Sequence, residues 1–298
     1  MQRFHTLYLK SLLLLLFLLT SFATIKAGAN NNEKALLWEI SGKGLKQPSY
    51  IFGTIHAICQ DEFTMPEAVK ARLQQTEQLS LEVDMDAPSF MTEMQQSLIL
   101  QNGGSLKSFF TEEEYKTLSE YFASNLGIPL QQVDMLKPLT LYSMLLSQLT
   151  DCQTVMLEQQ LMEMAHAQGK EIIGVETVKE QIAAMEQIPV QIQVNMLMET
   201  VREMDKAKAD YREMVALYLN KDVQGLFEVS RKDFTAEEYK AYEEAFLTSR
   251  NKRWIPVIER EVKSRPTFFA VGTGHLAGQN GLLELLRKQG YTIKPVLE

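Results

Sequence analysis

The sequence predicts an α/β protein, in which a mixed β-sheet built from both chain ends is joined through a large helical middle section. Three observations support this fold class. Apolar, β-like runs gather near the two ends; apolar residues recur at spacings of three and four between them; and no low-complexity linker divides the chain. We therefore expect one domain over residues 28–298, with a helical insertion at about 86–169 and helices across 177–263.

The strands are expected in a definite order. Runs 35–41 and 49–55 are joined through Gly42, Gly44 and Pro48, which predicts a hairpin. The later runs are 78–83, 171–175, 267–271 and 291–296, with a helix expected over 281–289 before the last of them.

The middle section shows helix signals. Acid-rich starts such as Thr111-Glu112-Glu113-Glu114 are typical of helix N-termini, and residues 177–219 look helical with an interruption near Pro189. Residues 185–214 are rich in methionine, and the spacing of these methionines favours packing in a core or lid over a binding groove.

The first 27 residues are expected to be a signal peptide. Residues 1–10 contain the basic residues Arg3 and Lys10 and no acidic residue, and residues 11–23 form a Leu/Phe run. The small residues Ala23 and Ala27 indicate two alternative cleavage points. The alternative is a retained membrane anchor, but the run is shorter than the ~20 residues of a spanning helix. We therefore expect cleavage, with no stable membrane insertion afterwards. The mature protein is then exported, either periplasmic or secreted.

The net charge limits the kinds of partner that we expect, and the two cysteines allow a disulfide. The formal net charge is −8, and removing the three basic residues of the leader leaves −11, which argues against nucleic acid. In an exported chain Cys59 and Cys152 allow one disulfide, although two buried thiols fit the sequence as well.

Two histidines follow strands in the same way. Pro48 to His56 and Pro266 to His275 are each an apolar run that ends in Gly-Thr-x-His, so each imidazole is presented where a strand gives way to a loop. A lone histidine there is usually structural, but the repeat favours a shared role. His166, near an expected helix C-terminus, is given none.

Two glutamates also close apolar runs. Glu82 and Glu176 must be paired, hydrogen-bonded or on a metal, because burying a bare carboxylate costs several kcal/mol. His56 and His275 with Glu82 would make a divalent-metal site, and a glutamate would serve as general base. Helix capping or ion pairing is the alternative for both glutamates.

Arg250 and Asn251 lie together on an expected helix. They would present a guanidinium and an amide to a bound carboxylate or oxyanion. A solvated basic helix face is the plainer interpretation.

Taken in order, these motifs resemble the TraB/GumN family, which includes TraB, PrgY and GumN proteins and is similar to the Tiki proteases. The resemblance runs from Leu37 to Val296 and rests on several segments. These are the two Gly-x-x-His motifs, Glu82-Val83-Asp84, Lys137-Pro138, Gly174 to Thr177 with Gln181, Arg250-Asn251, and Gly272 to Leu276 with Gly278 and Gly290-Tyr291.

The resemblance implies a fold like that of erythromycin esterases and haem-binding ChaN-like proteins. For the Tiki branch it implies peptide hydrolysis with a divalent metal, manganese or cobalt being favoured and zinc allowed. It points to His56, Glu82, His275, Arg250 and Asn251, with Glu176 as a further candidate. The chain departs from the family pattern at Leu139, where tryptophan is frequent, and at Glu158, where aspartate is frequent.

The sequence therefore predicts an exported metal-dependent hydrolase that acts on a peptide or protein, with Arg250 and Asn251 positioning the substrate. A pocket that binds a peptide or pheromone without cutting it is the first alternative, and an esterase or a haem-handling protein is the second. The apolar middle helices also allow a homodimer.

Overall fold

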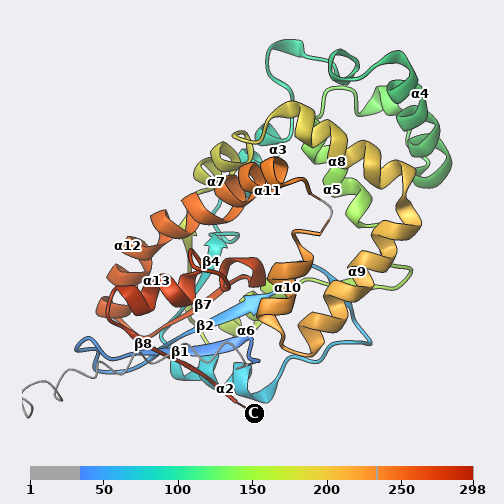
Figure 1. Ribbon diagram of the computed structural model, residues 1–298. Helices are drawn as coiled ribbons and strands as arrows, with labels where there is room; N and C mark the ends of the chain where they lie inside the picture. The colour runs from blue at the N-terminus through green and yellow to red at the C-terminus, as the bar shows by residue number, and fades with distance from the viewer. Residues whose placement is uncertain (1–33, 233, 298) are drawn as a thin grey trace, which may run out of the picture. The chain divides into compact units, whose positions relative to one another are not determined.

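The computed structural model describes residues 34–232 and 234–297 (Figure 1), so the expected signal peptide lies outside the described residues. The strands are β1 Leu37–Ser41, β2 Ser49–Thr54, β3 Ile58–Cys59, β4 Gln78–Val83, β5 Thr154–Val155, β6 Glu171–Glu176, β7 Thr267–Gly272 and β8 Thr292–Pro295.

The α-helices are α2 Glu67–Gln75, α3 Phe90–Ser97, α4 Glu112–Tyr121, α5 Pro138–Leu146, α6 Leu157–Ala167, α7 Val178–Met185, α8 Val190–Arg202, α9 Met204–Leu219, α10 Val223–Val229, α11 Ala236–Glu243, α12 Ser249–Ser264 and α13 Leu282–Lys288. Short 3₁₀ or π turns are η1 Gln101–Gly103, η2 Leu106–Phe109, η3 Phe122–Leu126, η4 Leu130–Gln132, η5 Glu244–Thr248 and η6 Thr273–His275.

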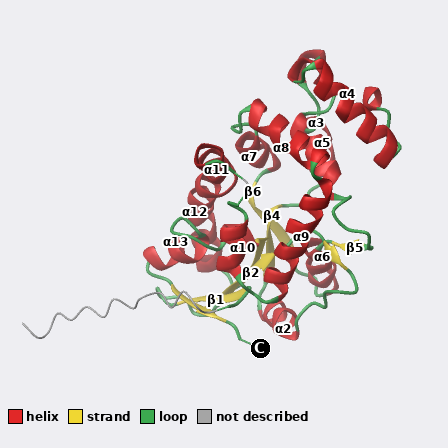
Figure 2. Cartoon of the chain, turned by 45° about the vertical axis from the view of Figure 1, so that its right-hand side comes forward, coloured by secondary structure: helices red, strands yellow, loops and turns green. Residues whose placement is uncertain are grey.

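A six-stranded mixed sheet in the order β6-β4-β7-β2-β1-β8 confirms the predicted fold class (Figure 2). The hairpin β1–β2 and the pair β1–β8 are antiparallel, whereas β2, β7, β4 and β6 run parallel. Strands from the two chain ends are therefore neighbours, as β2 and β7 show with Tyr50 opposite Phe268. The parallel arrangement brings four carboxyl ends to one edge of the sheet.

Helices cover both faces of this sheet (Figure 1). Successive side chains of a strand point to opposite faces. On β4, Gln78 donates to Glu261 of α12, so the alternate residues of this strand face α12. The strand's leucines, Leu79 and Leu81, are fully buried on the other face, where α6 contacts β4 and β6. The resulting core is continuous around the sheet.

The middle section has a hydrophobic core of its own. The side chains of this helical core come from η2, α4, η3, η4, α5 and α8: Leu106, Phe110, Leu118, Phe122, Leu130, Leu141, Leu145, Val194, Leu197, Met198 and Val201. The expected acid-rich start at Thr111 is a capping box, in which the hydroxyl accepts from the Glu114 N–H and the Glu114 carboxylate accepts from the Thr111 N–H.

A second, two-stranded sheet lies outside the sequence prediction. β3 pairs with β5 through Ile58–Val155 and Cys59–Thr154, inside stretches expected to be loop and helix. These strands are too short to give a periodic signal. The structure has the Cys59–Cys152 disulfide, one of the two alternatives that the sequence left open.

Candidate active site

The predicted site residues follow the carboxyl ends of the parallel strands. His56 follows β2, Glu82 is the next-to-last residue of β4, Glu176 ends β6, and His275 lies in η6 directly after β7. The first turn of α12 brings Arg250 to the same edge of the sheet. The structure thus collects groups that are far apart in sequence into one cluster.

Glu82 is the centre of this cluster, and its side chain is only 13% exposed. Its Oε1 accepts from the Gly272 N–H at 2.8 Å and lies 3.7 Å from His275 Nε2, while its Oε2 accepts from Arg250 at 2.6 Å. Burial alone would raise the pKa of Glu82, but His275, Arg250, His56 and the Gly272 N–H together lower it to about 2. Glu82 is therefore a permanent anion near neutral pH.

Arg250 is buried and connects the acidic groups. Its Nη2 donates to Glu82 and to Glu176 Oε1, its Nε donates to the same Glu176 oxygen at 2.9 Å, and its Nη1 faces His275 Nε2 at 3.1 Å. The guanidinium also lies over the Trp254 ring, 4.7 Å from the centroid. The structure thus places Arg250 in a buried ion-pair network, not on a solvated helix face.

Glu176 is the partner that fixes Arg250. Its Oε1 is held by Arg250, and its Oε2 accepts from Trp254 Nε1 at 3.0 Å. Both oxygens are engaged and the side chain is 2% exposed. This arrangement suits a group that orients Arg250 better than a base that takes a proton from water.

His275 is held in one tautomer by its neighbours. Because Arg250 Nη1 can only donate, Nε2 must accept, so the proton lies on Nδ1, which donates to Asn251 Oδ1 at 2.6 Å. The Asn251 amide nitrogen donates to the carbonyls of His275 and Asn280. Burial, chiefly, lowers the pKa of His275 to about 3. Asn251 therefore orients the imidazole. Its side-chain amide is already hydrogen-bonded to groups of the protein itself.

His56 is the exposed member of the cluster, with 74% of its side chain open to solvent. Its Nδ1 donates to Glu158 Oε1 at 3.2 Å, and the same oxygen accepts from the Thr54 hydroxyl at 2.7 Å. This hydrogen bond, more than any other factor, raises the pKa of His56 to about 9.

Glu158 is a site residue that sequence reasoning did not assign. It lies in the first turn of α6 and is 7% exposed, and its Oε2 is buried without a hydrogen-bond partner in the described part of the chain. The available signal was the resemblance, in which an acidic residue recurs at this position.

The three predicted metal ligands converge beside Gly272. A Cβ atom built on Gly272 would lie 3.2 Å from Glu82 Oε1 and 3.8 Å from both His56 Nε2 and His275 Cδ2. In each imidazole Nδ1 is held by an oxygen, which leaves Nε2 directed to the site. Ligating histidines in metal sites have this pattern. The donor set therefore fits a divalent cation in its chemistry.

Arg250 already uses part of that donor set. Its guanidinium faces His275 Nε2 and donates to Glu82 Oε2, and both of these side chains would be needed to hold a cation together with His56. In residues 34–232 and 234–297, accordingly, no three His, Cys, Asp or Glu side chains are arranged as a metal site.

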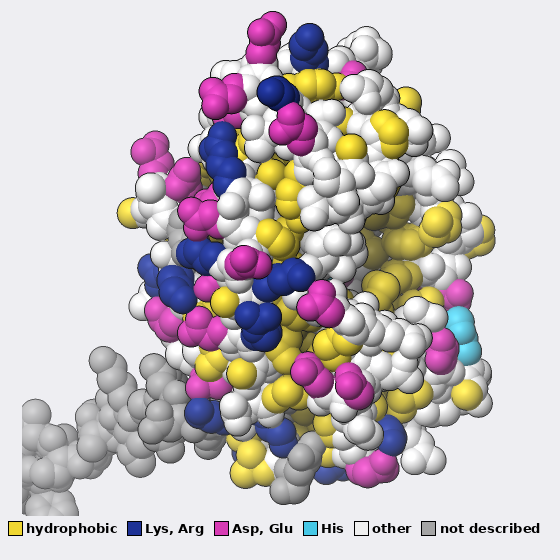
Figure 3. Space-filling model, turned by 90° about the vertical axis from the view of Figure 1, so that its right-hand side faces the viewer, with side chains coloured by type: hydrophobic (Ala, Val, Ile, Leu, Met, Phe, Trp, Pro, Cys, Tyr) yellow, Lys and Arg dark blue, Asp and Glu magenta, His cyan; other side chains and the backbone are white. Residues whose placement is uncertain are grey.

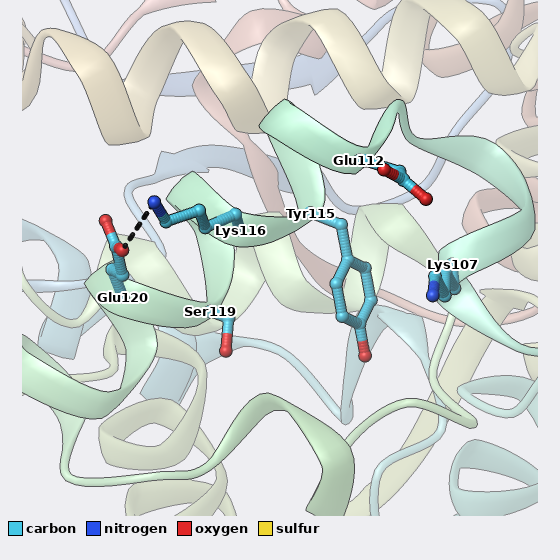
Figure 4. A pocket seen from close by; sticks show the side chains of 6 residues that line it. All are labelled: Lys107, Glu112, Tyr115, Lys116, Ser119 and Glu120. Atoms are coloured by element: carbon cyan, nitrogen blue, oxygen red, sulfur yellow. Dashed lines mark ion pairs between the residues drawn. The ribbon is translucent and has the colours of Figure 1, made fainter.

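The remaining sequence candidates lie apart from this cluster. His166 Nε2 is 3.1 Å from Asp86 Oδ2 at the surface, and Lys137 pairs with Glu186. A surface depression of about 370 Å³ on α4 and η2 contains none of the predicted site residues (Figure 4). Its lining includes Lys116 and Glu120, which pair with each other across 3.7 Å. This depression is therefore not part of the site.

A second cavity, of about 230 Å³, lies between α5, α8, α9 and α11 and includes Tyr211. The Tyr211 hydroxyl donates to the carbonyl of Ala57, the residue after His56, at 2.6 Å.

The described residues contain no membrane-spanning helix, because none of their helices is both long enough and apolar enough to cross a bilayer.

Comparison with known proteins adds one curated relative. Metalloprotease TIKI2 of Danio rerio is 21% identical over 323 residues, an alignment that covers 90% of this chain and 62% of that protein. The chain thus spans less than two thirds of the relative's length. No solved structure matches the chain significantly. The similarity is distant, and it is consistent with a hydrolase.

The sequence model of the TraB/PrgY/gumN family matches residues 36–295, which include every element of the main sheet. This match confirms the predicted resemblance. The chain belongs to the TraB/PrgY/gumN family.

Proposed function

We propose that this protein is an exported hydrolase that cleaves peptide bonds with the help of a divalent cation. The convergence of His56, Glu82 and His275 beside Gly272 is the observation that carries the proposal. The distant similarity to a metalloprotease supports it. The cation is proposed to be manganese or cobalt, with zinc as the alternative.

His56, His275 and Glu82 would hold the cation. A divalent cation bound there lowers the pKa of water toward neutrality and polarises a carbonyl group. Glu82 would take the proton of the attacking water at Oε1, the oxygen that accepts from the Gly272 N–H and lies where the two histidines converge. Its pKa of about 2 makes it a weak base alone, so the water must first be acidified.

Arg250 would change partners in this scheme. If His56, His275 and Glu82 held a cation, the Arg250 N–H groups that now lie on His275 and Glu82 would be released, while Glu176 would still hold Nε. The released N–H groups could then donate to the substrate carbonyl oxygen, where negative charge develops. Glu176 keeps Arg250 in reach, and Asn251 keeps His275 in its tautomer.

Metal content and peptide cleavage test the proposal together. Mature protein is reconstituted with manganese, cobalt or zinc, desalted and assayed by plasma mass spectrometry beside His56→Ala and His275→Ala. We expect near-stoichiometric metal in the wild type, its loss in both variants, and metal-dependent fragments from a peptide library. Normal cleavage by folded histidine variants would rule this mechanism out.

A peptide-binding module without cleavage is the second candidate. It is favoured by the same Arg250 contacts, because a guanidinium that neutralises Glu82 and Glu176 gives a complete site without a cation. Mass spectrometry separates the two, since a binding module leaves the mass of every incubated peptide unchanged.

Export is proposed from the leader and supported by the Cys59–Cys152 disulfide, because disulfides persist in oxidising compartments. The intact mass of protein recovered from a periplasmic or extracellular fraction should correspond to cleavage after Ala27 or Ala23. Recovery of the uncleaved chain from the cytoplasm would contradict export.

A further inference from the structure

We infer that the cavity between α5, α8, α9 and α11, here called the α8–α9 groove, binds the substrate through an apolar segment that carries a lysine or arginine. This inference rests on the proposed function and names its substrate class. The groove is lined by Tyr142, Leu146, Leu149, Ile192, Asn195, Met196, Glu199, Thr200, Glu203, Lys206, Ala207, Asp210, Tyr211, Met214, Phe234 and Glu238.

The division of α8 into two faces makes the groove apolar. One face of the helix is buried in the helical core, with Leu197 fully covered. The other face contributes Ile192 and Met196 to the groove lining. Leu146 of α5 lies on the same lining and is 44% exposed. On the side of the molecule that Figure 3 shows, hydrophobic side chains are visible inside a hollow of the surface.

The methionines of this region divide in the same way. Met198 packs in the helical core, as the spacing of the methionines predicts, whereas Met196 and Met214 line the groove. Methionine adapts its unbranched side chain to varied apolar partners. The lining therefore suits apolar side chains of more than one shape.

Two glutamates without a cationic partner among the described residues favour a positively charged side chain on the segment that the groove binds. Glu199 and Glu203, one helical turn apart, make no side-chain hydrogen bond or ion pair within residues 34–232 and 234–297. Asp210, by contrast, is paired with Lys206 and Lys232. Two free carboxylates beside an apolar lining complement a segment in which a basic side chain adjoins apolar ones.

The lining of the groove is also connected to the candidate active site through packed side chains. Phe234 of its lining stacks on Tyr242 with centroids 5.1 Å apart, and Tyr242 packs on Phe246 at 4.7 Å. The Phe246 carbonyl accepts from Arg250 Nη1 at 3.1 Å. On the opposite side, Tyr211 is bonded to the residue that follows His56. A peptide in the groove is thus flanked by walls that lead to both His56 and Arg250.

Fluorescence anisotropy tests this assignment on the mature full-length chain carrying His56→Ala, so that probes are not consumed. The probes are three short labelled peptides on one Gly-Ser framework, with Leu and Lys, Leu and Glu, or Ser and Lys at the variable positions. We expect the Leu-Lys peptide to bind most tightly and to weaken with salt. The double change Glu199→Gln/Glu203→Gln should weaken it roughly fivefold, as expected for exposed charge pairs.

Two further variants sharpen the result. Leu146→Ser should also weaken the Leu-Lys peptide, whereas the charge-matched control Glu112→Gln/Glu113→Gln on α4 should leave its affinity unchanged. Equal binding of the Leu-Lys and Leu-Glu peptides, or full affinity in the groove double variant with the far-UV spectrum retained, would overturn the assignment.

The wild-type protein, assayed in parallel, separates this inference from the proposed function. Charge-selective binding without any cleavage would contradict the peptidase function and support the groove as a binding site. Metal-dependent cleavage whose KM is insensitive to Glu199→Gln/Glu203→Gln would support the peptidase function and contradict the groove as the binding site.

Discussion

Glu158 determines the charge of His56, because its Oε1 accepts from Nδ1 and raises the pKa of the imidazole to about 9. Glu158→Gln should bring that pKa back toward the ordinary value of about 6.5, as followed by NMR titration of the ring protons. Glu163→Gln on the same helix is the matched control, because the Glu163 carboxylate accepts from Gln159 and not from His56. An unchanged His56 titration in Glu158→Gln would contradict the assigned contact.

The raised pKa also gives a sign for the pH dependence of stability. His56 binds its proton more tightly in the folded state, so its contribution is complete below about pH 6.5 and is lost as pH rises through about 9. The wild type should therefore lose more free energy of unfolding than Glu158→Gln between these limits. Urea denaturation at both pH values measures the difference.

Arg250 is the residue whose loss should be most costly. Arg250→Met leaves Glu82 and Glu176 buried without their cation, and breaking a buried pair costs about 3–5 kcal/mol. Arg260→Met, a charge-matched change at a side chain that is 68% exposed, should cost less than about 1 kcal/mol. Denaturant unfolding compares the two, and a small loss in Arg250→Met would mean that the buried network stabilises little.

At the scale of elements, the regular strands were predictable and the short ones were not. Runs 49–55 and 267–271 are apolar and long enough to identify as β2 and β7. β3 and β5 have two residues each, and they are strands only because they pair with each other over a long distance in the sequence. The ends of the strands also explain the site. His56, Glu82 and His275 could be identified because each lies at or just after the end of an apolar strand, whereas Glu158 lies on a helix.

The Cys59–Cys152 bond lies beside the paired elements β3 and β5 and joins residues that are 93 positions apart in the sequence. The double change Cys59→Ala/Cys152→Ala should lower the free energy of unfolding by about 2–4 kcal/mol, because the unfolded chain gains freedom. Equilibrium denaturation of the variant against the oxidised wild type measures this loss. Equal stability would show that the bond constrains the unfolded chain little.

Across the part of the molecule that the structure describes, the buried hydrophobic residues form two cores with different relations to function. The main core surrounds the sheet whose strand ends hold His56, Glu82 and His275. The helical core supports α8, whose other face lines the α8–α9 groove. The sequence indicated both helices and strands, but which helical face meets a core and which meets a cavity depends on long-range packing. Binding of a cation and binding of a peptide segment should therefore depend on different cores.

Leu197→Ala tests this division. Leu197 is fully buried in the helical core, and its truncation should cost about 2–5 kcal/mol and disturb α8 while leaving the sheet edge intact. We expect weaker binding of the Leu-Lys peptide with metal content retained. Phe269→Ala, an equally buried site on β7 in the main core, should lower both. Anisotropy and plasma mass spectrometry on folded fractions measure the two properties. Loss of metal in Leu197→Ala, to the same extent as in Phe269→Ala, would show that the two cores act as one unit.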